Sequence, residues 1–211
     1  MIFIFDMGGV VTTSAAVEKQ ICNVIGISEE QFFEYCGCGN GNASYGDPGV
    51  KLNKYVPNSS DLLTLLSNGT ITTNQFWQEF SARSGKSIQS DYWHLLFHPE
   101  LNGDVVKIVK KLRGKYRVVC GTNTIDSHYM NHIERGDYTL FDQTYASNIL
   151  GVSKPDPKFW KLILLAENVN PEGAFFTDDN INNCAAASSL KLRVHQFINA
   201  ADLEAAVSEW L

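Results

Sequence analysis

The sequence predicts an α/β protein with a doubly wound parallel sheet and a helical unit inserted after the first strand. Residues 2–5 form a short apolar run, which is typical of a buried parallel strand. Residues 14–96 show almost only helical patterns, whereas strands and helices alternate from residue 104 onward. Because a crossover helix needs only about a dozen residues, the much longer first connection indicates an inserted unit.

Composition excludes several classes of function. The chain has 211 residues, 44% of them hydrophobic, and a net charge of -6, so no basic surface suggests nucleic-acid binding. Its apolar runs are shorter than the roughly 20 residues that span a bilayer. The first apolar run also lacks the basic residues that begin a signal peptide. We therefore expect a cytoplasmic protein without nucleic-acid or membrane partners, and the sequence leaves its oligomeric state open.

Cysteine usage indicates thiols and no metal site. The number of cysteines is odd and their spacing matches no zinc pattern. They are Cys22, Cys36, Cys38, Cys120 and Cys184. We expect all of them to be reduced, with Cys120 and Cys184 packed in the core.

The helical unit is predicted from periodicity and capping signals. Residues 14–25 have apolar positions close to a helical period. Capping-box sequences at 28–31 and 72–75 each precede aromatic residues and predict two helix starts. Further helices are predicted over 59–66 and 91–97.

The second half of the chain is predicted as alternating strands and helices. The predicted strands are 117–121, 144–147, 174–177 and 192–197, and the predicted helices are 105–112, 125–133, 157–166 and 200–211. Asp156 before Pro157 gives the strongest helix start, with Asp156 as N-cap and Pro157 at the first helical position.

Polar residues follow the clear strands where an open α/β sheet binds ligands. Asp6 follows the first strand, Thr122 ends the second, and Asp178 and Asp179 end a later one. Lys154 lies in a loop before a helix. Each residue alone is typical of a turn, a helix cap or a solvated loop. Their common place at one sheet edge favours a shared site.

Charge suggests what these residues do. Two or three carboxylates placed together are costly unless a cation neutralises them, and hard oxygen ligands suit Mg²⁺. An ionised Asp6 can then attack phosphorus and form an acyl phosphate. Thr122 and Asn123 can donate hydrogen bonds to phosphate oxygens, and Lys154 can neutralise charge on the transferring group.

The sequence resembles the haloacid dehalogenase (HAD) superfamily, closest to its phosphatase branch with a helical cap. Four stretches carry the resemblance, and together they span essentially the whole chain. They are Ile2-Phe3-Ile4-Phe5-Asp6-Met7-Gly8-Gly9-Val10, Val118-Val119-Cys120-Gly121-Thr122-Asn123, Ser153-Lys154-Pro155-Asp156-Pro157 and Phe175-Phe176-Thr177-Asp178-Asp179-Asn180.

The resemblance implies an organisation and a site. It implies a core of residues 1–13 and 97–211 with sheet order 5-4-1-2-3, and a cap of residues 14–96. It implies that Asp6 is the nucleophile, Thr122 the phosphate-binding hydroxyl and Lys154 the conserved-type lysine. The implied Mg²⁺ ligands are Asp6, the Gly8 carbonyl, Asp178 and Asp179.

One position departs from the family. Most of its phosphatases have a second Asp two residues after the nucleophile, which protonates the leaving oxygen, and here that position is Gly8. Loss of such a group typically costs about 10²- to 10⁴-fold in rate. Gly at this place also resembles the glucose-1-phosphatase-like members. Because an anomeric oxygen leaves more easily than an ordinary alkoxide, we expect a small phosphorylated metabolite such as a sugar 1-phosphate.

Two alternatives stay open. Dehalogenase members use the same Asp to displace halide from carbon without a metal, and the acidic pair Asp178 and Asp179 disfavours that reading. A phospholigand-binding protein without turnover would explain Gly8 but not a retained nucleophile.

Substrate choice is expected to lie in the cap. Candidate contacts are Tyr45, Lys51, Arg83, Trp93 and His94, with a glycine-rich stretch at 37–49 as a flexible lid. His94 is also a candidate for the missing acid-base group.

Overall fold

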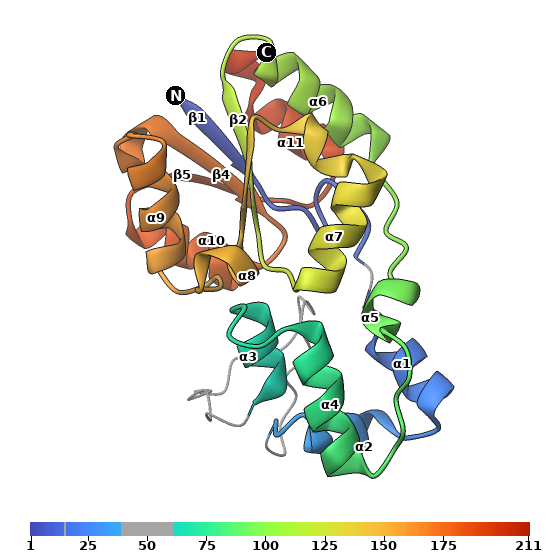
Figure 1. Ribbon diagram of the computed structural model, residues 1–211. Helices are drawn as coiled ribbons and strands as arrows, with labels where there is room; N and C mark the ends of the chain where they lie inside the picture. The colour runs from blue at the N-terminus through green and yellow to red at the C-terminus, as the bar shows by residue number, and fades with distance from the viewer. Residues whose placement is uncertain (15, 39–60) are drawn as a thin grey trace.

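The computed structural model describes residues 1–14, 16–38 and 61–211 (Figure 1). Its centre is one parallel sheet of five strands in the order β3-β2-β1-β4-β5. The strands are β1 (Ile2–Phe5), β2 (Arg117–Thr122), β3 (Gln143–Ala146), β4 (Ala174–Asp178) and β5 (Arg193–Gln196). The predicted fold class is confirmed, because this order is 5-4-1-2-3 counted from the other edge.

Helices cover both faces of the sheet, and β1 shows why. Its side chains alternate between the two faces, as in any strand. Phe3 and Phe5 pack in one core cluster with α6 (Gly103–Arg113) and α11 (Ala200–Ala206). Ile2 and Ile4 pack in another with α9 (Lys158–Ala166) and α10 (Ile181–Ser189). Both faces of β1 are therefore buried, which explains its uninterrupted apolar sequence.

The connection from β1 to β2 holds a separate group of helices. They are α1 (Glu18–Ile25), α2 (Glu29–Tyr35), α3 (Leu62–Ser67), α4 (Thr73–Ser84) and α5 (Tyr92–Leu95). Figure 1 shows them beyond the sheet, facing α7 (Asp126–Arg135) and α8 (Ser147–Leu150). They bury a hydrophobic cluster of their own, rich in aromatic rings. Phe97 and Ile125 also belong to this cluster, so the helical group packs directly against the α/β part.

Capping signals located the helix starts well. Ser28 and Thr72 each accept a hydrogen bond from the backbone N–H of the glutamine three residues later, and that glutamine bonds back to the cap. Both predicted capping boxes are therefore present. The helix predicted over 59–66 is described from Asp61, whose carboxylate caps α3, while residues 59 and 60 lie outside the described residues.

Several predicted helix ends need correction. The helix predicted over 14–25 begins only at Glu18, and the one predicted over 91–97 ends at Leu95. The helix predicted from Pro157 begins at Lys158, although the Asp156 carboxylate still accepts the Lys158 N–H at 2.8 Å. The final helix does not run to Leu211, because α11 ends at Ala206 and a 3₁₀ turn follows at Ser208–Trp210. This turn brings the Trp210 ring 5.4 Å from the Phe3 ring, so packing on the sheet ends the helix early.

All five cysteines are free thiols, as predicted, and all five are buried. Cys120 and Cys184 are 0% and 4% exposed, consistent with core positions. Within the described ranges, no helix is long and apolar enough to cross a membrane.

Candidate active site

The first two acidic residues meet because their strands are neighbours. β1 and β4 run parallel with Phe5 opposite Thr177, so the residues that follow them, Asp6 and Asp178, lie at the same sheet edge. The Asp6 N–H donates to the Thr177 carbonyl at 3.0 Å and extends the ladder. Residues 172 positions apart in the chain are thus placed side by side by backbone pairing.

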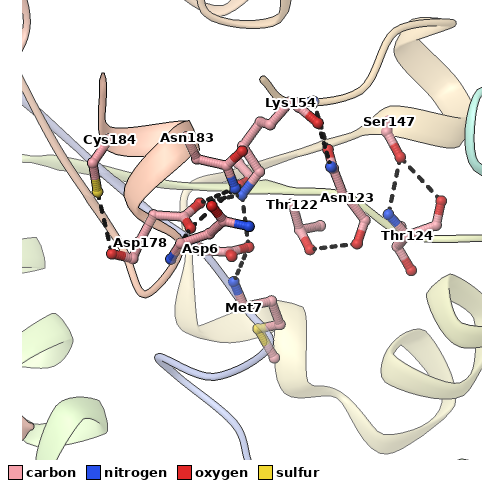
Figure 2. A network of polar contacts seen from close by, with 12 residues as sticks. Asp6, Met7, Thr122, Asn123, Thr124, Ser147, Lys154, Asp178, Asn183 and Cys184 are labelled. Atoms are coloured by element: carbon pink, nitrogen blue, oxygen red, sulfur yellow. Dashed lines mark hydrogen bonds and ion pairs between the residues drawn. The ribbon is translucent and has the colours of Figure 1, made fainter. Parts of the chain in front are cut away.

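Lys154 bridges the two carboxylates. Its Nζ lies 2.9 Å from Asp6 Oδ1 and 2.7 Å from Asp178 Oδ2 (Figure 2). The same ammonium donates to the Gly121 carbonyl at 2.9 Å. The Lys154 side chain is 1% exposed, and this buried charge is matched by acceptors from three different strand ends.

Burial and mutual repulsion control the proton affinity of this cluster. Desolvation, reinforced by the charge of Asp178, raises the pKa of Asp6 to about 8, although Lys154 pulls it down. Burial and the same Asp178 charge raise the pKa of Asp179. Burial lowers the pKa of Lys154, but Asp178 and Asp6 outweigh it, so the net pKa is raised. Asp6 therefore needs a further cation beside it to stay ionised near neutral pH.

The donor set fits a divalent cation. Asp6, Asp178 and Asp179 each offer a carboxylate oxygen, and these atoms lie within 4.8 Å of one another. Gly9 makes room for Asp179: a Cβ there would lie 2.3 Å from Asp179 Oδ2, and φ of +78° suits glycine. Clustered hard oxygen donors of this kind match the preference of Mg²⁺.

Asp178 is held in place by groups that the sequence did not reveal. The Asn183 side chain donates to both of its oxygens, at 3.0 and 3.1 Å, and the Asn180 N–H donates to Oδ1 at 2.9 Å. Asn183 lies on α10 outside any recognised motif. Its only sequence signal is its position one helical turn beyond the strand end.

Thr122 and Asn123 lie beside the cluster, with different surroundings. Thr122 is 3% exposed, and its hydroxyl bonds the Asn123 carbonyl at 3.3 Å. The Asn123 side chain clamps the Lys154 backbone, because Nδ2 donates to its carbonyl and Oδ1 accepts its N–H, both at 2.8 Å. Asn123 thus positions Lys154, and its contact with phosphate stays a prediction.

Gly8 differs from Gly9 in the space around it. A Cβ built on Gly8 meets no atom within 4 Å, so a side chain there would enter open space. Packing therefore does not require a glycine at position 8, and an aspartate would fit there.

The residues predicted to contact substrate from the cap differ in their surroundings. Tyr45 and Lys51, and the predicted lid from 39 to 49, lie outside the described residues. Arg83 pairs with Glu79 at 2.8 Å and also bonds the Tyr35 carbonyl, and Trp93 is buried in the aromatic cluster. We therefore give Trp93 a structural role, whereas a substrate contact of Arg83 stays a prediction.

His94 lies against α7. Its Nδ1 is 3.2 Å from the Ser127 carbonyl and its Nε2 is 3.3 Å from Glu134. A hollow of about 540 Å³ beside it is lined by residues of α4, α5 and α7 and by none of the clustered carboxylates. These contacts do not support His94 as the acid-base group.

Comparison with known proteins identifies the family. A family model described as haloacid dehalogenase-like hydrolase matches residues 1–190. A sesquiterpene phosphatase from Aspergillus oryzae is 23% identical over 177 residues, which cover 72% of this chain and 88% of the relative. A drimenol cyclase from Aspergillus calidoustus is 39% identical over 57 residues. That match covers 27% of this chain and only 11% of the cyclase.

Solved structures share the fold over nearly the whole chain. A HAD family enzyme from Bacteroides thetaiotaomicron superposes with a TM-score of 0.73 at 21% identity, covering 97% of this chain and 96% of that one. The same enzyme has been crystallised with magnesium and inorganic phosphate. A HAD-like family hydrolase from Porphyromonas gingivalis superposes with a TM-score of 0.75 at 20% identity, covering 99% and 96%. The structures show a shared fold, and the family model over residues 1–190 shows that this chain belongs to the haloacid dehalogenase-like hydrolases.

Proposed function

We propose that this enzyme is a Mg²⁺-dependent phosphomonoester hydrolase that acts through a phosphorylated Asp6. The observation that carries the proposal is the buried contact of Asp6 with Lys154 beside Asp178 and Asp179. An ion pair with only a structural role would not need two further acidic residues beside it. The cluster is better explained if Asp6 attacks a phosphate group. The A. oryzae sesquiterpene phosphatase, a relative along most of the chain, supports the same reaction class.

The chain's own residues divide the reaction between them. An Asp6 oxygen attacks phosphorus, a bond from that oxygen to phosphorus forms, and the ester P–O bond breaks. Lys154 lies within ion-pair distance of Asp6 and offsets the charge of the incoming phosphate. The Thr122 hydroxyl donates to a phosphate oxygen. Water then attacks phosphorus, and inorganic phosphate leaves while the Asp6 carboxylate is restored.

The carboxylates of Asp6, Asp178 and Asp179, with the Gly8 carbonyl, would hold Mg²⁺. Bound there, the ion would supply Lewis acidity toward the phosphate and would keep Asp6 ionised near neutral pH despite the raised pKa of Asp6. Without such an ion, burial and the neighbouring Asp178 favour a protonated and unreactive Asp6.

Gly8 restricts the substrates that fit this scheme. With no carboxylic acid at position 8, the departing alcohol oxygen depends on its own stability or on a proton from water. This favours a small phosphorylated metabolite with a good leaving group, such as a sugar 1-phosphate. A terpenyl phosphate is the second substrate class, because the curated relatives act in sesquiterpene and drimenol chemistry.

Residues 14–96 act as the cap in this proposal, and residues 1–13 and 97–211 form the catalytic core. The described helices of the cap have their own aromatic cluster and face the sheet edge that carries the carboxylates (Figure 1). Closure of such a unit excludes water and lets cap side chains select the alcohol part of the substrate.

Phosphate release tests the function directly. We would measure it from hexose 1- and 6-phosphates, farnesyl phosphate and p-nitrophenyl phosphate, with Mg²⁺ and with EDTA. We expect release that needs Mg²⁺ and disappears in Asp6→Asn. Asp104→Asn, at an exposed aspartate of α6, is the matched control and should behave as wild type.

Two further arms address the alternatives. Halide release from 2-haloacids without metal would replace the phosphatase by a dehalogenase. Tight binding of a phospholigand, with wild type and Asp6→Asn equally inactive on all esters, would mean a binding protein.

A further inference from the structure

The turn that ends α3 touches the α/β part of the molecule close to the catalytic lysine. Ser67 Oγ lies 2.9 Å from Ser153 Oγ, and the Ser153 hydroxyl donates to Asn68 Oδ1 at 2.6 Å. Ser153 is the residue immediately before Lys154. We call residues 67–69 the docking turn. Its hydroxyl and amide groups therefore reach the loop that carries the catalytic ammonium.

A second contact ties the docking turn to the end of β2. Ser147 is fully buried, and its Oγ lies 2.8 Å from the Ser67 carbonyl and 3.0 Å from the Thr124 carbonyl. The same hydroxyl accepts the Thr124 N–H at 2.9 Å (Figure 2). Thr124 comes directly after Asn123 in the chain, so Ser147 connects the docking turn to the segment that carries Thr122 and Asn123.

Gly69 shows that the two parts approach as closely as backbones allow. It has φ of +62°, and a Cβ placed on it would lie 1.9 Å from the Asn148 carbonyl oxygen. Any side chain at this position would force the docking turn away from α8. The contact thus requires a glycine both for its conformation and for its proximity.

The Lys154 loop is held from two sides. Asn123 clamps the Lys154 backbone from the α/β side through two hydrogen bonds of 2.8 Å. Ser153 is held from the other side by the docking turn. Removing either side leaves the loop with one support, while the ammonium must stay within ion-pair distance of Asp6 and Asp178.

We propose that Ser153 is a positioning residue through which docking of residues 67–69 fixes Lys154 against Asp6. This inference rests on the proposed function, because Lys154 matters only if Asp6 reacts. It assigns the cap a second task beyond selecting the substrate. While the docking turn contacts the α/β part, the Lys154 loop is held on both sides. When the turn moves away, the loop loses the contacts of Ser153 with Ser67 and Asn68.

A pair of glycine variants tests the docking turn. Gly69→Ala adds a methyl group against the Asn148 carbonyl, whereas Gly26→Ala adds one at φ of +69° with nothing within 4 Å. Both positions have a similar positive φ, so alanine is disfavoured at each, but only the first variant blocks docking. We expect kcat of Gly69→Ala to fall about 10- to 100-fold, as for a misplaced catalytic group. Gly26→Ala should stay within about twofold of wild type, since its Cβ meets no neighbour.

Hydrogen exchange reads out the same step without any substrate. The Lys154 N–H, bonded to Asn123 Oδ1, should exchange at least about tenfold faster in Gly69→Ala than in Gly26→Ala. Equal exchange and equal kcat in the two variants would overturn the proposal. If wild type hydrolyses no ester at all, the proposed function fails, while the exchange comparison still decides whether docking orders the lysine loop.

A second pair serves if Gly69→Ala does not fold. Ser153→Ala removes the hydroxyl that contacts Ser67 and Asn68, and Ser153→Thr retains it. We expect the alanine variant to lose about tenfold in kcat with little change in KM, and the threonine variant to regain most of that loss. Equal activity of both variants and wild type would contradict a positioning role.

Discussion

The interior of the cap and the floor of the site, by which we mean Asp6, Lys154 and Asp178, are both buried. The first consists of apolar side chains and the second of ionisable ones. In the cap, the Phe80 ring lies 5.2 Å from Phe32 and 5.8 Å from Phe76, centre to centre, in a cluster of apolar side chains. At the floor of the site, the ionisable groups of Asp6, Lys154 and Asp178 are buried in contact with one another. Aromatic packing is favourable on its own. Buried charges are costly unless each keeps its partner.

This difference predicts that substitutions in the two regions affect different properties of the protein. A change in the cap interior removes favourable packing and should act on stability and closure. A change at the floor leaves an unpaired charge and should act on the reaction and on stability together. The four predictions that follow test this division, in order of decreasing effect.

Lys154→Met should give the largest effect. It removes the only described cation within contact of Asp6 and Asp178, and leaves both buried carboxyl groups without their ion-pair partner. We expect kcat/KM to fall by about 10³-fold or more, and the free energy of unfolding in EDTA to fall by roughly 3–5 kcal/mol. Steady-state kinetics and urea unfolding measure the two losses.

Lys158→Met is the matched control, because Lys158 is exposed at the start of α9. It should change both quantities little. Similar losses in the two variants would mean that the charge at position 154 has no special role.

Phe80→Ala should destabilise the cap alone. Its side chain is fully buried among Phe32, Tyr35, Phe76 and Trp77, so truncation leaves a cavity. We expect a loss of roughly 3–5 kcal/mol in stability. Hydrogen exchange should quicken in residues 73–84 and stay slow in β1, β2 and β4.

Phe80→Leu keeps most of the volume and should cost less than the alanine variant. If exchange in the sheet strands quickened as much as in the cap helices, the two interiors would form one cooperative unit. The division drawn above would then be wrong.

Gly8→Asp should add chemistry to the floor without a packing penalty. The new side chain enters open space, and an acid there can protonate the leaving oxygen. We expect kcat for esters of ordinary alcohols to rise by about 10- to 100-fold. Gly8→Asn has the same shape without the acid, and an equal rate in both variants would exclude general acid catalysis from position 8.

His128, which packs from α7 against Trp93 and Phe97 of the cap cluster, should make stability depend on pH. Its ring stacks on Phe97, with 3.7 Å between ring centres, and burial lowers its pKa from 6.5 to about 3. The unfolded chain therefore takes up the proton first as the pH falls. This stabilising contribution is complete above pH 6.5 and is lost progressively toward about pH 3.

Between pH 7.5 and 5.5, wild type should lose about 1.4 kcal/mol more than His128→Phe. Urea unfolding at the two pH values measures the difference. Parallel pH profiles for both proteins would show that folding does not lower the pKa of His128.

The sequence predicts the framework of this molecule better than its supporting contacts. β1, the alternating second half and both capping boxes follow from local pattern, because burial of both sheet faces and the needs of helix ends leave direct traces in the chain. The early end of α11 left no such trace. It depends on Trp210 packing on Phe3 from the far end of the chain.

The site shows the same limit. Asp6, Lys154, Asp178 and Asp179 are brought together as expected from their places at strand ends. Asn183, Ser147 and Ser153 were missed, because a polar residue on a helix or loop has no pattern until its partner is known. Asn123 was identified for its amide, but its two bonds to the Lys154 backbone depend on a loop about 30 residues away.

The position of β1 in the sheet also affects how the protein folds during its synthesis. Its partners are β2 and β4, which begin at residues 117 and 174. During synthesis the apolar run Ile2–Phe5 therefore waits for more than a hundred residues before it can pair on either side. The cap sequence is synthesised before β2 and can bury its own aromatic cluster. β1 meanwhile has no partner strand and can pair with strands of other chains. We expect nascent chains that end before residue 117 to depend on ribosome-associated chaperones.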